Sequence, residues 1–397
     1  MDPPTDALPG RPASPSRRTL LLGSLGAVGA AAVGGLAGYG IGRLGDTAQA
    51  APAVSGASTI APVPATGRTQ AGVSRPATPQ AHGLLLVADI GGDDLGFLAA
   101  VSESILAMTG TDASTHVDVL PDGPGDLTVT IGIGPRLVAA ADASLPGAED
   151  LPLFAGDDAI DAARRGGDIL IAAYSSDPTI LGPVVDHLHT LLPSPRVRWR
   201  QRMFRAPGEG TVARNPLGFH DGIVVPHGAE ELDENVWLDG ALDGATICVI
   251  RRLRLDTDAF LAMREKDQEA TIGRKKSSGA PLSGGERDSQ VDLLAKTPDG
   301  QFIVPLHSHA RAAHPSFTGS GLMLRRGYGY DNGETSDGET DAGLVFICFQ
   351  RELRTFTATQ HRLDETDDLM RFVTPTASAT FLILPGFSEE QPLRLPS

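Results

Sequence analysis

The chain has 397 residues, a formal net charge of −16 and an isoelectric point near 5.0. This length suits two domains of ordinary size or one large one, and 41% hydrophobic residues can form a substantial core. The acidic balance argues against nucleic acid and anionic membrane surfaces as partners. Cys248 and Cys348 each lie in an apolar run typical of a buried strand, so we interpret them as structural thiols.

The N-terminus has the layout of an export signal. Arg17 and Arg18 precede a weakly apolar run rich in glycine and alanine, and a small-residue "AQA" stretch ends at Ala50. This order is typical of a twin-arginine signal over residues 1–50. It predicts export across the cytoplasmic membrane to a secreted or extracytoplasmic location, with the twin-arginine translocation machinery as a partner. A transmembrane anchor is the alternative, which the glycine content disfavours.

Residues 51–81 are rich in Ala, Pro, Ser, Thr and Gly, and this composition predicts a disordered linker.

From His82 the chain alternates between strand and helix patterns. An apolar strand is expected at 83–90, and the helix after it has its apolar residues at helical spacing. The expected elements that follow are strands at 127–134 and 168–175, a helix at 179–192, a strand at 197–204 and a short helix at 157–164. The order is the βαββαβ order of a ferredoxin-like unit, which we assign to residues 82–225.

The second half repeats this order. The expected elements are strands at 245–255, 322–330, 343–350 and 377–385, and helices at 257–271 and 356–372. We therefore predict an α+β protein of two fused ferredoxin-like units with antiparallel sheets, the second unit covering residues 226–397. About fifty residues, 273–321, separate the first helix from the next strand, and so long a connection inside a domain is usually functional or disordered.

Chemistry-bearing side chains gather in two places. The 273–321 connection holds His307, His309 and His314, whose spacing matches no common zinc motif. The crossover between the two units holds Asp221 in "NPLGFHDGIVVPH", next to Gly222. An Asp in a surface turn is the ordinary interpretation of this stretch, but a carboxylate from the crossover and histidines from the connection could also meet at one cavity.

Four segments in order resemble the dye-decolorising (DyP-type) peroxidase family, of the exported twin-arginine kind. "GFHDG" is similar to the family's G-x-x-D-G motif, "HARAAHP" to H-x-R-x-x-x-P, and "LRRGYGYD" to L-R-R-G-Y. "FICFQREL" with "ILPG" resembles its closing block, and "IGRKKSSGAPL" also fits. The resemblance runs from about residue 82 to 387.

The resemblance implies haem b (iron protoporphyrin IX), held in the second unit, and peroxidase activity. His309 corresponds to the proximal iron ligand, with His307 as the alternative ligand. Asp221 corresponds to the distal acid–base carboxylate and Arg325 to the distal arginine, with Gly222 letting the backbone approach the macrocycle. Hydrogen peroxide and an aromatic reductant are the implied substrates, and the implied cycle runs through a ferryl intermediate.

Further roles follow by the same resemblance. Arg311 corresponds to a haem propionate partner. Glu352 occupies the position of the acid that bonds the proximal histidine, although the family has Asp there. Tyr328 and Tyr330 are either electron relays for bulky dyes or core residues.

The chain departs from the family's D-G-T-x-N-P stretch, because Ile223 and Val225 replace Thr and Asn. Two hydrogen-bonding side chains beside the expected cavity are thereby lost. The alternatives to a peroxidase that oxidises dyes, phenolic or other aromatic donors are therefore a deferrochelatase-like release of iron from haem and a non-catalytic haem-binding protein. Homo-oligomerisation is left open.

Overall fold

The computed structural model describes residues 61–110, 118–336 and 338–396. The predicted signal at 1–50 lies outside the described residues. Contacts unite Ser58–Ser397 in one unit, so the two predicted halves belong to one body. Within the described part, no helix combines the length and apolar character needed to cross a bilayer.

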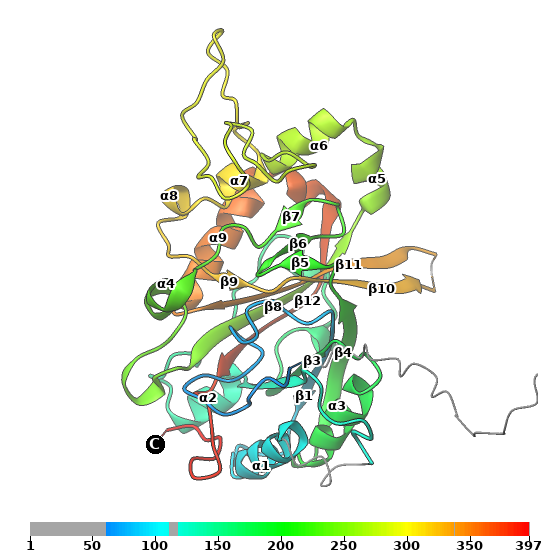
Figure 1. Ribbon diagram of the computed structural model, residues 1–397, viewed down its shortest axis with the longest axis vertical. Coiled ribbons are helices and arrows are strands. Elements are labelled where there is room, and N and C mark those ends of the chain that lie inside the picture. The colour runs from blue at the N-terminus through cyan, green and yellow to red at the C-terminus, as the bar shows by residue number, and fades with distance from the viewer. Residues whose placement is uncertain (1–60, 111–117, 337, 397) are drawn as a thin grey trace, which may run out of the picture. The chain divides into compact units, whose positions relative to one another are not determined.

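The first half forms an antiparallel sheet in the order β4-β1-β3-β2, with helices on one face (Figure 1). Its elements are β1 (His82–Asp89), α1 (Phe97–Thr109), β2 (Thr128–Ile133), α2 (Pro135–Ala141), β3 (Ile169–Ser175), α3 (Leu181–Thr190) and β4 (Arg196–Phe204). The expected short helix at 157–164 is two 3₁₀ turns, η2 (Asp157–Ala159) and η3 (Ala162–Arg164).

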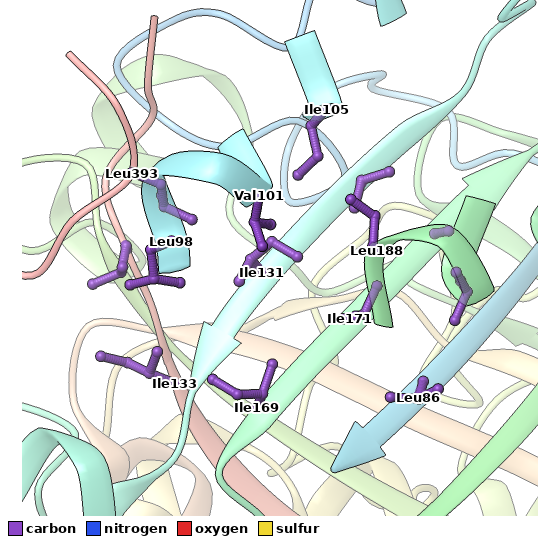
Figure 2. Packing of buried hydrophobic residues seen from close by; sticks show 14 of the residues in the cluster. Leu86, Leu98, Val101, Ile105, Ile131, Ile133, Ile169, Ile171, Leu188 and Leu393 are labelled. Atoms are coloured by element: carbon purple, nitrogen blue, oxygen red, sulfur yellow. The ribbon is translucent and has the colours of Figure 1, made fainter. Parts of the chain in front are cut away.

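Alternation along the strands builds the first core. Every second side chain of β2 and β3 faces α1 and α3, whose apolar residues recur at helical spacing. Figure 2 shows Val101 of α1 beside Ile131 of β2, with Leu98, Ile171 and Leu188 in the same cluster. These side chains are almost fully buried, and this burial fixes the helices on the sheet.

The second half repeats the arrangement with the order β12-β8-β11-β9, and this repetition confirms the predicted pair of ferredoxin-like units. Its elements are η4 (Gly240–Leu242), β8 (Thr246–Leu255), α5 (Thr257–Ala262), α6 (Glu265–Ile272), β9 (Leu324–Arg325), β10 (Tyr328–Glu334), β11 (Thr340–Gln350), α9 (Leu353–Thr366), η5 (Asp368–Phe372) and β12 (Val373–Ile383). The expected helix at 257–271 is broken in two at Met263 and Arg264, which have extended backbone.

The two sheets join into a closed ring of strands. β12 pairs with β2 at one seam, while β10 pairs with β11 and, through Gly329 and Phe204, with β4 at the other. The inward side chains of both halves form one shared core, which includes Tyr174, Tyr328 and Tyr330. The outward face of the second sheet is left for the functional site.

Of the linker predicted at 51–81, residues 51–60 lie outside the described residues, and residues 61–81 are not disordered as their composition predicts. Gln70 and Val73 have no exposed surface. The Gln70 side chain donates to the carbonyls of Ile131 and Leu384, and its Oε1 accepts from the Ile131 amide, so it bridges β2 and the end of β12 at the seam. The hydrogen bonds of Gln70 and the burial of Val73 in the shared core hold this segment, and its composition does not reveal either.

Two connections cover the outward face of the second sheet. The crossover between the halves forms a small sheet, β5 (Gly208–Glu209), β6 (Val212–Arg214) and β7 (His220–Asp221), followed by α4 (Gly228–Asn235). The 273–321 connection (yellow in Figure 1) carries α7 (His309–Ala312) and α8 (Pro315–Thr318), and α7 contacts α6 and α9. The long connection is thus ordered, and it brings His309 to the crossover.

Candidate active site

One cavity lies where the two connections meet the second sheet. It encloses about 1750 Å³ of empty space when its open mouth is counted. Its lining is mainly apolar, and the apolar side chains come from β8, β11, β12, α6, α9 and the loops between them. They include Leu253, Leu255, Ile272, Met323, Phe346, Phe356, Leu363 and Met370. The polar residues of the lining include Asp221, Arg274, His309 and Arg325.

A tight backbone approach sets the position of Asp221 on β7. Gly222 has φ +83°, and a Cβ there would lie 2.1 Å from the Thr211 carbonyl oxygen. Only glycine fits, because the position needs both a left-handed backbone and close contact with the neighbouring chain. Gly222 also lines the cavity, and its approach to a macrocycle stays a prediction.

Asp221 and Arg325 form a partly buried pair. Arg325 Nη2 lies 3.4 Å from Asp221 Oδ1, and Arg325 Nη1 donates to the Val224 carbonyl at 2.8 Å. The Gly222 amide also donates to Oδ1, at 2.6 Å. Burial alone raises the pKa of Asp221, but the Arg325 charge, the Gly222 hydrogen bond, Arg205 and His309 together bring that pKa below its ordinary value.

His309 enters the cavity from α7 with one nitrogen already engaged. Its Nδ1 lies 2.6 Å from Oδ2 of Asp367, a carboxylate with no exposed surface. Burial lowers the pKa of His309, and the Asp367 charge and hydrogen bond more than reverse this, so the pKa is raised. In neutral imidazole the Nδ1 proton is therefore held toward Asp367, and the Nε2 lone pair is left as a metal ligand.

Asp367, not Glu352, is the acid behind His309. Glu352 begins α9 as an exposed residue and does not line the cavity, which contradicts its predicted role. Asp367 has left the helix into extended backbone, so its side chain can cap η5 through the Leu369 amide and still reach His309. The sequence offers several acids here and no signal that separates them.

Arg311 is likewise not placed as predicted. Its Nε and Nη2 donate to the carbonyls of Leu293, Val304 and Pro305, it stacks over Phe302, and it lies outside the cavity lining. Arg311 therefore stabilises the 273–321 connection, and its guanidinium is not directed into the cavity where a propionate would bind.

His307 also lies outside the cavity lining. It is exposed, and its Nδ1 contacts the Thr366 carbonyl, which removes it as the alternative ligand.

Arg274 is a cavity residue that the sequence analysis did not single out. Its Nη1 donates to the carbonyls of Gly279 and Arg287, whereas its buried Nη2 has no hydrogen-bond partner among the described residues. Burial lowers the pKa of Arg274, and Arg325 adds to the effect. A buried guanidinium in this state is stabilised by an incoming anion. The only available signal was its place in "IGRKKSSGAPL".

These residues fit haem b. The macrocycle needs an apolar cavity, its iron needs a free imidazole nitrogen, and its propionates need a cation. The lining supplies the apolar cavity, His309 Nε2 can bind the iron, and Arg274 Nη2 can pair with a propionate. No group of three or more His, Cys, Asp or Glu that could hold a metal ion occurs in the described part of the chain, so the His307, His309 and His314 cluster forms no zinc site.

Two other sequence-based expectations change. Tyr328 and Tyr330 are buried core residues outside the cavity lining, and the Tyr328 hydroxyl donates to the Gln80 carbonyl. Of the two departures near Asp221, only Ile223 lines the cavity, while Val225 packs in the shared core. Only one hydrogen-bonding side chain is therefore lost beside the cavity.

Fold and site together define a haem-binding α+β protein. Comparisons with known proteins show to which family of haem proteins it belongs. The family profile "Dyp-type peroxidase, C-terminal" matches residues 212–388. The chain is 33% identical over 279 residues to a dye-decolorizing peroxidase of Thermobifida fusca, covering 66% of this chain and 65% of that protein. It is 31% identical over 423 aligned residues to a deferrochelatase of Yersinia pestis, covering 95% of this chain and 93% of the relative.

Solved structures of DyP-type peroxidases have the same fold as this chain. A DyP-type peroxidase from Streptomyces coelicolor superposes with a TM-score of 0.77 and 30% identity, over 84% of this chain and 96% of the other. Ferric DtpA from Streptomyces lividans gives a TM-score of 0.78 at 30% identity, over 84% and 96% of the two chains. The chain belongs to the DyP-type peroxidases, a family of enzymes whose cofactor is haem b.

Proposed function

We propose that this chain reduces hydrogen peroxide and oxidises dyes, phenolic or other aromatic donors. The observation that carries the proposal is that Asp221, Arg325 and His309 all line one apolar cavity. Arg325 pairs with Asp221, and Asp367 is hydrogen-bonded to His309. Bound haem iron would supply the electron transfer between peroxide and donor. In balance, one peroxide takes two electrons and two protons and leaves as two waters, while two donor molecules lose one electron each.

Asp221 would move the proton. Its Oδ1 is engaged by Gly222 and Arg325, whereas Oδ2 has no hydrogen-bond partner among the described residues and can accept a proton from peroxide. Because the pKa of Asp221 is lowered, the carboxylate stays ionised into acidic solution. Returning that proton to the departing oxygen completes the transfer.

Arg325 and His309 would support this step from fixed positions. Arg325 is held by the Val224 carbonyl and offers a positive charge where negative charge develops on the leaving oxygen. His309 would hold the iron through Nε2, and the Asp367 carboxylate makes its imidazole more electron-donating.

Peroxide-dependent oxidation of a phenol by the haem-loaded protein tests the proposal, with Asp221→Asn as the variant. Loss of the base should slow the reaction with peroxide by about 10²-fold or more. Asp331→Asn is the matched control, since Asp331 is exposed and caps only its own turn. Equal rates for the wild type and Asp221→Asn would contradict the assignment.

Release of iron from haem is the second candidate, because the relative that matches over nearly the whole chain is named deferrochelatase. Incubation with haem, followed by assays for free ferrous iron and for intact protoporphyrin, separates the two. Iron release without peroxide-dependent turnover favours the second candidate. A haem spectrum with neither activity favours a non-catalytic haem-binding protein.

The export route is part of the proposal. Arg17 and Arg18 lie outside the described residues, and their support is the sequence pattern alone. Replacing both with Lys should retain the protein in the cytoplasm of a bacterial host with this export route, and unchanged export would contradict the assignment.

A further inference from the structure

Arg205 belongs to the same unit as Asp221, and its charge acts on the Asp221 carboxylate. It follows β4, the last strand of the first unit, and its amide donates to the Ala81 carbonyl. It does not line the cavity. Its guanidinium is half-buried and lies over the Tyr328 ring, 6.0 Å from the ring centre.

The two ends of this guanidinium bind the two chain segments that flank Asp221. Nη2 donates to the Thr211 carbonyl, and Nη1 donates to the Gly327 carbonyl at 2.8 Å. Thr211 in turn binds the residue after Asp221, because its hydroxyl donates to the Gly222 carbonyl at 2.8 Å. A rigid planar fork is suited to such a bridge, and lysine cannot reproduce it.

Gly327 lies on the other side of the carboxylate. A Cβ at Gly327 would lie 3.5 Å from Asp221 Oδ2, and Gly327 is two residues beyond Arg325. One side chain thus connects the segment that carries Asp221 to the segment that carries Arg325.

We infer that Arg205 is a positioning residue that holds Asp221 and Arg325 in register for the reaction with peroxide. This inference rests on the proposed function. Arg205 touches neither substrate nor cofactor, and it acts through the two carbonyls and through its charge.

The positive charge of Arg205 also affects the pKa of Asp221. The groups that face Asp221 are the Gly222 amide, Arg325 from β9, Arg205 from the end of β4 and His309 from α7, with His220 as its chain neighbour. Arg205 is one of the cations that lower the pKa of Asp221. Removing Arg205 should therefore move the acidic limit of the peroxide reaction to higher pH, which a purely structural role would not do.

The test measures the second-order rate constant for peroxide with the haem-loaded protein as a function of pH. Arg205→Gln should lower the constant by about ten- to hundredfold, as expected for a misplaced catalytic group, and shift the acid limb upward. Arg205→Lys should keep the acid limb near its wild-type position and recover only part of the rate, since one amine cannot bind both carbonyls as the fork does. Arg200→Gln is the matched control, because Arg200 lies on β4 and pairs with Asp186 at the surface.

Soret absorbance and circular dichroism establish that each variant is folded and loaded. If Arg205→Gln does not fold, the rate and acid limb of Arg205→Lys decide the question. A rate and pH profile equal to those of Arg200→Gln would overturn the inference. Asp221→Asn, measured in parallel, reports on the proposed function itself: if that variant is also unimpaired the proposed function fails, whereas an impaired Asp221→Asn confines the failure to Arg205.

Discussion

His309 Nδ1 and Asp367 Oδ2 lie 2.6 Å apart, although 58 residues separate them in the chain. The pair forms because the His307–His309 segment docks on the end of α9, where the Asp368 amide also donates to the His307 carbonyl. A short bond to a fully buried carboxylate orients the imidazole and leaves its second nitrogen toward the cavity.

His309→Ala should abolish haem retention. The variant removes an imidazole that lines the cavity and is hydrogen-bonded to the Asp367 carboxylate. We expect loss of the Soret band from purified protein and loss of peroxide-dependent turnover. His307→Ala is the control, since the His307 side chain is exposed and contacts the Thr366 carbonyl outside the cavity lining, and this variant should keep both. Pigment and turnover that survive in His309→Ala would place the iron ligand elsewhere.

Asp367→Asn should raise the iron reduction potential and weaken catalysis. The neutral amide no longer makes the imidazole electron-rich, so ferrous iron is favoured and activity should fall about ten- to hundredfold. Spectroelectrochemical titration and peroxide kinetics measure the two effects. Glu352→Gln is the control that tests the corrected assignment. A larger change in potential for Glu352→Gln than for Asp367→Asn would restore Glu352 as the acid.

The fold was predictable from the sequence because each half carries strand and helix periodicities in the same order. Asp221, His309 and Arg325 could be placed together because their motifs recur in the family in that order. Asp367 and Arg274 could not be assigned, since their roles depend on where a helix ends and on one unsatisfied nitrogen. Gln70 was missed because its contacts are long-range hydrogen bonds within a segment of loop-like composition.

The reaction with peroxide should persist into acidic solution. Asp221 works as a base when ionised, and its folded pKa lies below the ordinary 3.8. The rate is therefore full above this pKa and falls as the pH drops through it. Arg325→Gln removes a lowering charge, so the acid limb should move to higher pH while the plateau rate drops by about 10²–10³-fold. Stopped-flow mixing at a series of pH values measures both, with exposed Arg196→Gln as the control. An acid limb that stays in place would show that Arg325 does not set the ionisation of Asp221.

The segment at 61–81 should contribute to global stability through Gln70. Gln70→Ala leaves the Ile131 amide and carbonyl without their side-chain partner inside the seam. Each buried group left unsatisfied costs about 1–3 kcal/mol. Urea unfolding followed by circular dichroism should give a lower midpoint. Gln301→Ala, at an exposed position, should leave the midpoint unchanged, and an equal midpoint for both variants would indicate that the segment is not part of the cooperative unit.

Restoring the family's residues should affect stability differently at positions 223 and 225. Ile223 lines the cavity, so a Thr hydroxyl at 223 can find water or substrate, and stability should change little. Val225 is 2% exposed in the shared core, where an Asn amide would be buried at a cost of about 1–3 kcal/mol. Urea unfolding of Ile223→Thr and Val225→Asn compares the two, and the peroxide rate of Ile223→Thr then measures the effect of the lost hydroxyl alone. A stable Val225→Asn with a raised peroxide rate would mean that this side chain reaches the cavity after all. Val225 in place of Asn would then affect the reaction itself, whereas its present contacts place it in the core, away from the cavity.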